Sequence, residues 1–104
     1  MRIVVANDPL AYRDVIGSTV RVLRPDVDVV TVAPDELEKA MLDSAPDLVV
    51  CSRLTAAVDA RARAWIMLYP DGASGATISV AGERTTVADI DFLGLLTAID
   101  RATH

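Results

Sequence analysis

The chain has 104 residues and a formal net charge of −5, so it is long enough for one domain and too short for two. A composition of 52% hydrophobic and 24% charged residues fits a compact core rather than a disordered tail. The acidic balance argues against sequence-independent binding to nucleic acid, which needs a basic face. We therefore expect residues 1–104 to form a single domain of the α/β or α+β class that binds no nucleic acid.

The sequence also argues against several kinds of site and location. Its apolar runs are too short to cross a bilayer, and no basic stretch followed by a long apolar one opens it. We therefore expect a cytoplasmic protein with no membrane partner. The single histidine, His104, leaves no basis for a Ser-His-Asp triad or a histidine-rich metal site. We expect no metal and no cofactor.

The single cysteine, Cys51, excludes an intrachain disulfide and a cysteine-based zinc site. Free cysteine is among the most buried residue types, so Cys51 is expected to be a small buried apolar residue. The alternative is a redox switch, which needs an exposed thiol with a lowered pKa, and Arg53 nearby is a cation that would lower it.

Strand and helix patterns alternate along the first part of the chain. Apolar runs predict buried strands at 3–6, 27–32, 48–51 and 64–69. Apolar residues at helical spacing predict helices at 10–23, around 37–41 and at 55–63. This alternation predicts a parallel sheet with right-handed crossovers and helices on both faces.

Polar residues at the strand–helix junctions are candidate helix caps. Asp8 is expected to be the N-cap of the first helix, with Pro9 at its first position. Ser52 and Thr55 lie where a strand gives way to a helix, so capping is their expected role as well.

The last third of the chain departs from this alternation. Residues 76–80 and 84–88 flank a turn at Ala81-Gly82-Glu83 and predict a β-hairpin. Pro70-Asp71-Gly72 is expected to end the preceding strand in a turn. Residues 70–75 are too few for a crossover helix, so strand 76–80 is expected to run antiparallel to the strand before it.

A final helix, expected from about residue 90 to 102, supplies the candidate interface. Asp89 or Asp91 is expected to cap it. Its buried face is predicted to carry Phe92, Leu95, Leu96 and Ile99. Leu93 lies off that face, so we expect it to point outward and to contribute to a protein interface.

Two stretches resemble the receiver domain of two-component response regulators, the CheY-like superfamily. Asn7-Asp8-Pro9-Leu10-Ala11-Tyr12-Arg13 follows the first strand, where family members often carry two acidic residues and then a stretch such as His-Pro-Leu-Val-Arg. Pro46-Asp47-Leu48-Val49-Val50-Cys51-Ser52 lies where they often carry Pro-Asp-Leu-Val-Leu-Leu-Asp. The resemblance covers roughly residues 1–69 and, more loosely, the final helix. We therefore expect a flavodoxin/CheY-like three-layer sandwich with a mostly parallel sheet of order 2-1-3-4, in which a C-terminal β-hairpin replaces the fourth helix.

Departures from the family pattern imply a pseudo-receiver, which keeps the scaffold and has lost phosphotransfer. Ser52 stands in place of the phosphoacceptor aspartate, and Asn7 replaces one of the two acidic residues that hold Mg²⁺ in the family, so only Asp8 supplies a carboxylate. Tyr69 stands at the position where the fourth strand of family members normally ends in Thr or Ser. No lysine follows Lys39, so the cation that would neutralise the phosphoryl oxygens is missing. A serine without an activating base is a weak nucleophile.

The expected function is therefore that of a non-catalytic, unphosphorylated signalling or regulatory module that binds an unidentified protein, with a homodimer as the simplest partner. The alternative is a small-ligand-binding domain or small enzyme at the carboxyl edge of the sheet. A candidate degenerate site lies there, formed by Asn7, Asp8, Ser52 and Tyr69. No glycine-rich phosphate loop supports the alternative, because Gly72-Ala73-Ser74-Gly75 has neither the GxGxxG spacing nor the Walker spacing.

Overall fold

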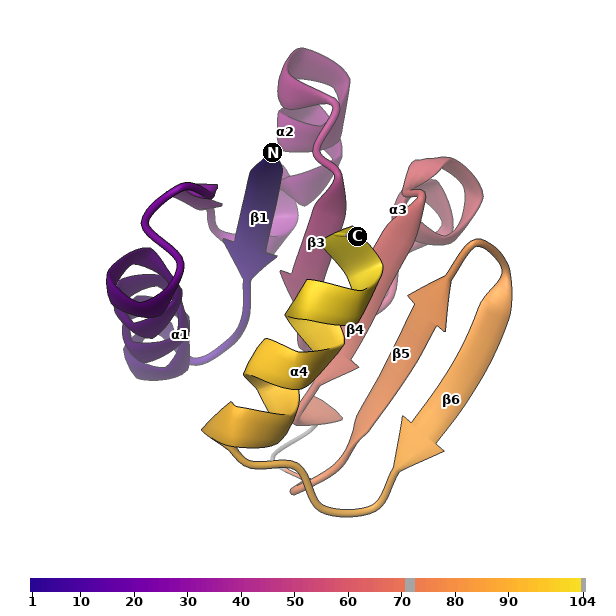
Figure 1. Cartoon of the computed structure of the whole chain (residues 1–104). Helices are drawn as coiled ribbons and strands as arrows, with labels where there is room; N and C mark the ends of the chain where they lie inside the picture. The colour runs from indigo at the N-terminus through magenta and orange to yellow at the C-terminus, as the bar shows by residue number, and fades with distance from the viewer. Residues whose placement is uncertain (71–72, 104) are drawn as a thin grey trace.

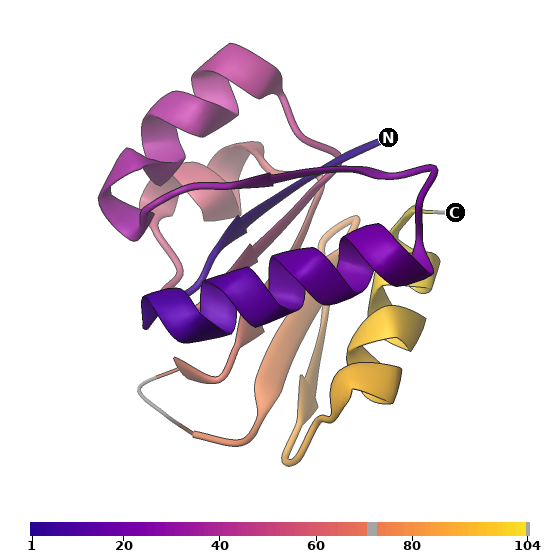
Figure 2. The ribbon, with the colours of Figure 1, turned by 90° about the vertical axis from the view of Figure 1, so that its left-hand side faces the viewer.

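The computed structural model describes residues 1–70 and 73–103, and its helices lie on both faces of a central sheet (Figures 1 and 2). Asp71 and Gly72 of the expected turn, and the histidine His104, lie outside the described residues. No helix within the described ranges has the length and apolar character needed to span a bilayer.

The first part of the sheet is parallel. Its strands are β1 (Arg2–Ala6), β2 (Asp28–Thr31), β3 (Leu48–Cys51) and β4 (Ala64–Leu68). They lie in the order β2-β1-β3-β4, and each neighbouring pair is parallel. Every residue of β3 is buried. A strand covered by helices on both faces needs apolar residues at each position rather than at alternate ones, which is the pattern that predicted it.

Four helices cover the two faces within the described part of the chain. The helices α1 (Leu10–Leu23) and α4 (Phe92–Thr103) lie on one face, and α2 (Leu37–Ser44) and α3 (Ala56–Arg61) lie on the other, with a short 3₁₀ turn at Pro34–Glu36 before α2. Alternate residues of β1 contribute to two cores, because successive side chains of a strand point to opposite faces. Ile3 and Val5 pack in the core beneath α1 and α4, and Val4 and Ala6 pack in the core beneath α2 and α3.

A hairpin completes the sheet. Strands β5 (Ala76–Val80) and β6 (Glu83–Val87) extend it beyond β4, and both new pairings are antiparallel. The turn between them is formed by Ala81 (φ 52°) and Gly82 (φ 87°). Positive φ at both central positions gives a turn whose twist matches that of the flanking strands.

The expected fold class is wrong. The sheet is not the mostly parallel sheet of a flavodoxin/CheY-like sandwich, because two of the five strand pairings in the described chain are antiparallel. No described residue of β5 or β6 belongs to the core beneath α2 and α3. The antiparallel pairing arises because the link between β4 and β5 is too short to hold a crossover helix. The antiparallel direction of residues 76–80, predicted from that link, is confirmed.

Three helix starts test the capping predictions. Thr55 caps α3 as expected, since its Oγ1 accepts a hydrogen bond from Val58 N–H (3.2 Å). Asp91 caps α4, where its Oδ1 accepts from Gly94 N–H (2.8 Å). The prediction for Asp8 is wrong, because α1 begins at Leu10 and its N-cap is Pro9, without a side-chain cap. Asp8 thus lies one residue too early to reach the free N–H groups of the helix.

The buried face of α4 differs from the prediction at its first residue. Leu95, Leu96 and Ile99 are buried, whereas Phe92 is 38% exposed. Near the start of the helix, Tyr69 packs against the core beneath α1 and α4 and donates its hydroxyl to Ile90 O (2.6 Å).

Candidate functional site

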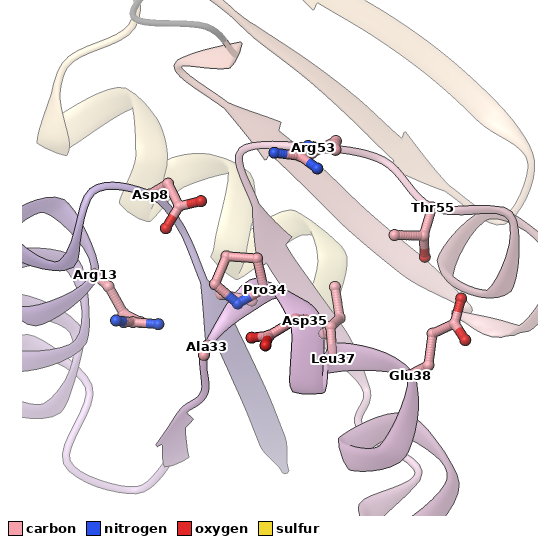
Figure 3. Close-up of a pocket in the computed structure, with 10 residues that line it drawn as sticks. Asp8, Arg13, Ala33, Pro34, Asp35, Leu37, Glu38, Arg53 and Thr55 are labelled. Atoms are coloured by element: carbon pink, nitrogen blue, oxygen red, sulfur yellow. The ribbon is translucent and has the colours of Figure 1, made fainter.

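A pocket of about 550 Å³ lies at the carboxyl ends of β1, β2 and β3 (Figure 3). The chain leaves β1 toward the α1 face and leaves β3 toward the α3 face, so the connections diverge between these neighbouring strands. Such a switch point is where ligands bind in open α/β sheets. The lining residues are Ala6, Asp8, Arg13, Ala33, Pro34, Asp35, Leu37, Glu38, Arg53 and Thr55.

Five charged side chains surround this pocket, three acidic and two basic (Figure 3). They are Asp8, Arg13, Asp35, Glu38 and Arg53. Arg13 donates one hydrogen bond to Val32 O (2.9 Å), which holds its stem against β2. Within the described residues, none of the five takes part in an ion pair. Their charges are therefore available to a polar molecule in the pocket.

The structure brings the predicted site residues to one edge of the sheet. Asp8 N–H donates to Ser52 Oγ (3.0 Å), which ties the end of β1 to the end of β3. Asn7 Nδ2 donates to Leu68 O (2.9 Å), which ties β1 to β4. Asn7 is fully buried, and its Oδ1 has no hydrogen-bond partner among the described residues. Asn7 and Ser52 thus serve the scaffold.

Tyr69 is directed away from the pocket. Its backbone has a positive φ of 53°, and its ring makes an edge-to-face contact with Tyr12, with 5.9 Å between centroids. Burial raises the pKa of the Tyr69 phenol, and the nearby charge of Asp91 raises it further. A phenol that stays protonated and donates to Ile90 O is a structural contact rather than a reactive group. Among the four predicted residues, only Asp8 lines the pocket.

Cys51 is buried, with 1% of its surface exposed, as predicted. Burial raises the pKa of its thiol to about 11, although a backbone hydrogen bond at Arg53 acts in the opposite direction. The thiol is thus protonated near neutral pH and inaccessible, which disfavours the redox reading of this residue.

Several pocket residues were missed from the sequence. Arg13, Asp35 and Glu38 lie on α1, the 3₁₀ turn and α2, and none was predicted to be a site residue. The signal that could have identified Asp35 and Glu38 is their position just after a predicted strand of a parallel sheet. Arg13 lies within a helix, so only the packing of α1 beside β2 reveals its position.

A second candidate is the surface formed by α1 and α4, which lie on the same face of the sheet and approach each other toward the C-terminal end of α1 (Figures 1 and 2). The two helices are joined by an ion pair between Arg24 and Asp100 (2.6 Å). Seven large apolar side chains are exposed on them. Six of these form one surface, namely Tyr12, Val15, Val22, Leu23, Phe92 and Leu93, and the seventh is Leu10 at the start of α1. We call this surface the α1–α4 face. Leu93 is 74% exposed and Val22 is 75% exposed. Leu93 therefore points outward as predicted.

Charged residues are nearly absent from the α1–α4 face. Helical spacing assigns to it positions 11, 12, 15, 18, 19, 22 and 23 of α1 and positions 92, 93, 96, 97 and 100 of α4. Asp100 is the only charged residue among these positions, and it pairs with Arg24. A shallow, widely open depression lies on α1, lined by Ser18, Thr19, Val22 and Leu23.

The two candidates differ in chemistry, since the pocket is lined by charges of both signs and the α1–α4 face is apolar. Within the described residues, no three metal-ligating side chains come together at either place. The function of the chain must therefore be inferred from these two surfaces. No protein-family model, curated protein or solved structure matches the chain.

Proposed function

We propose that this chain is a non-catalytic protein-interaction module of the pseudo-receiver kind, acting in the cytoplasm, and that the α1–α4 face binds its partner. The proposal rests on the six exposed apolar side chains of two adjacent helices, where the single charged position is already paired. Contiguous exposed apolar surface commonly marks an interaction site, and the cores of protein interfaces are depleted in charge.

The partner that suits this face is the apolar side of an amphipathic helix. The apolar ridge of such a helix can pack against the exposed apolar side chains of α1 and α4. The depression on α1 lies beside Val22 and Leu23, which are both exposed. A partner with a strongly charged surface would lose hydration there without gaining an opposite charge.

We infer that this chain does not carry out phosphotransfer, which agrees with a role in binding. Ser52 Oγ accepts a hydrogen bond from Asp8 N–H, and its only neighbouring carboxylate in the predicted site is that of Asp8. We expect acetyl phosphate to leave no phosphoryl adduct on the protein. Intact-protein mass spectrometry checks this, and a stoichiometric adduct would contradict the proposal.

A capture experiment with a matched control tests the binding face. Leu93 on α4 and Leu42 on α2 are exposed to similar extents, 74% and 67%, so Leu93→Asp and Leu42→Asp introduce the same change at two separate surfaces. We expect a protein captured by the wild type and by Leu42→Asp to bind Leu93→Asp at least about tenfold more weakly, a loss of roughly 1.4 kcal/mol. Binding of that purified partner to Leu93→Asp and to Val22→Asp as tightly as to the wild type would contradict the proposal.

A second candidate function is small-ligand binding in the pocket at the carboxyl edge. The observation that favours it is the pair of guanidinium groups, Arg13 and Arg53, that face three carboxylates without forming ion pairs among the described residues. Such a lining suits a small molecule that carries both a positive and a negative charge. Native mass spectrometry of the purified chain provides the check. A retained small molecule that is lost in Arg53→Ala would favour this function over the first.

A further inference from the structure

The two edges of the sheet differ in how their backbone is protected. At the β2 edge, Arg21 Nη2 donates to Val29 O (3.1 Å) and Arg13 Nη1 donates to Val32 O (2.9 Å), so side chains of α1 already occupy carbonyl groups there. At the opposite edge, no described strand lies beyond β6. Figure 1 shows β6 running along the outside of the sheet. An unprotected edge strand is a template for pairing with another strand.

The hydrogen bonds between β4 and β5 show which way the peptide groups of β5 face. Tyr69 N–H donates to Gly75 O (3.0 Å), and Ala81 N–H donates to Arg63 O (3.2 Å). In an antiparallel pair, residues whose backbone groups face the partner alternate with residues whose groups face away. The odd-numbered residues of β5 therefore face β4, and its even-numbered residues face β6.

The register between β5 and β6 then identifies the free groups of β6. The even-numbered residues of β5 lie opposite Glu83, Thr85 and Val87, so these three turn their peptide groups into the sheet. The peptide groups of Arg84 and Thr86 consequently point outward from the edge. Each can donate one hydrogen bond and accept another.

The side chains of β6 leave this edge accessible. Arg84 is the only cation of the strand, and it is drawn across the sheet by an ion pair with Asp59 (2.7 Å) and by its position over the Trp65 ring, 5.3 Å from the centroid. The Arg84 side chain is thereby held over the face of the sheet rather than beyond its edge. Thr85 and Thr86 are β-branched and exposed, and β-branched residues favour strands.

We propose that β6 pairs with β6 of a second copy of this chain, antiparallel and centred on Thr85, so that two sheets join into one. In that register Arg84 lies opposite Thr86 of the second copy, and Thr86 lies opposite Arg84. These are the residues with outward peptide groups, so the same edge supplies matching donors and acceptors on both copies. Glu83 then lies opposite Val87, and no charged residue lies directly opposite a like charge. This self-complementarity, together with the absence of opposed like charges, permits a closed two-fold dimer, which needs one surface that matches itself.

A charge-exchange experiment tests this register, because Thr85 lies opposite its own copy. Thr85→Lys and Thr85→Asp each place two like charges directly opposite one another, which is unfavourable across a strand pair. We expect the wild-type chain to sediment as a dimer and each variant alone to sediment as a monomer. An equimolar mixture of the two variants should restore the dimer. Wild-type protein that remains monomeric at high concentration overturns the proposal, as does a mixture that stays monomeric.

A matched pair of substitutions at Thr86 separates the backbone from the side chain. Thr86→Pro removes an outward N–H, and proline is tolerated at an edge strand where the N–H faces solvent. Thr86→Val keeps the N–H and the branched shape. We expect Thr86→Pro to be a folded monomer by circular dichroism and sedimentation, and Thr86→Val to be a dimer. Dimeric Thr86→Pro would contradict pairing through this edge.

The test also separates this dimer from binding at the α1–α4 face. Leu93→Asp should remain dimeric, and Thr85→Lys should still bind the partner captured by that face. A dimer that is lost in Leu93→Asp and kept in Thr85→Lys would place self-association on the helices and overturn the proposal for β6.

Discussion

Strand β3 is buried at every position, whereas β6 is exposed at four of its five positions. Both strands belong to one sheet, yet β3 has helices on both faces and a strand on each side. β6 pairs only with β5 among the described residues. The sequences reflect the difference, since β3 is Leu-Val-Val-Cys and β6 is Glu-Arg-Thr-Thr-Val.

The difference separates the two tasks of the chain. Apolar burial stabilises a fold at about 25 cal/mol per Å² of surface removed from water, so most of the stability should reside in the parallel half. Exposed backbone and exposed apolar side chains are the features that bind other molecules, and these lie on β6 and on the α1–α4 face. Substitutions in the two regions should therefore have different effects.

The largest expected effect comes from a core deletion in the parallel half. Ile66 on β4 is fully buried, and Ile66→Ala should lower the free energy of unfolding by about 2–5 kcal/mol, because it leaves a cavity. Thr85→Ala on β6 should change it by less than about 1 kcal/mol. Urea unfolding followed by circular dichroism measures both. Equal losses would mean that the two halves contribute equally.

The thiol of Cys51 at the end of β3 should make stability fall at alkaline pH. Its pKa is raised to about 11 in the folded chain from 9.0, so between these values the unfolded state releases the proton first. The free energy of unfolding should therefore decrease as pH rises through this window, by about 2–3 kcal/mol in total. Unfolding of the wild type and of Cys51→Ala at several pH values isolates the effect. Parallel pH profiles for the two proteins would show that the thiol is exposed.

Alanine substitutions at two glycines of the hairpin half should lower stability by different amounts. A Cβ at Gly75 would lie 2.6 Å from Val87 O and 2.9 Å from Ala88 O, so Gly75→Ala should cost about 1–3 kcal/mol through displacement of backbone. Gly82 has a φ of +87° and open space around it. Gly82→Ala should therefore cost only about 1 kcal/mol, from backbone strain. Thermal melts compare the two variants, and a larger cost at Gly82 would argue against this packing.

The smallest expected effects concern the helix caps. Asp91→Ala should lower stability by about 1 kcal/mol, because the carboxylate accepts from Gly94 N–H. Asp91→Asn should keep most of the wild-type stability, because asparagine can also cap a helix. Asp8→Ala should change stability by less than about 0.5 kcal/mol, because Asp8 caps no helix. A large loss of stability in Asp8→Ala would instead support the capping role predicted from the sequence.

Local patterns in the sequence predicted the elements well. The helix at 10–23 and the strands at 48–51 and 76–80 have the predicted boundaries, and the other strands differ by one or two residues. Thr55 was also identified correctly as a cap, whereas the same prediction for Ser52 is wrong, because its hydroxyl accepts from Asp8 N–H instead. These features depend on side-chain spacing and on hydrogen bonds between residues close in the chain, so they are encoded locally.

Contacts between distant segments were decided only by the tertiary structure. Asp8 bonds to Ser52, 44 residues away, rather than to the adjacent helix, and Phe92 stays partly exposed whereas Tyr69 packs against the core. The pocket collects Arg13, Asp35 and Glu38 from elements that meet only after the sheet has assembled. The mixed sheet has the same cause at a larger scale: a short link reverses the chain after β4, and the resulting hairpin leaves one half of the sheet without a second helical layer. Burial and pairing depend on which surfaces come together, and that is a property of the assembled fold rather than of any one segment.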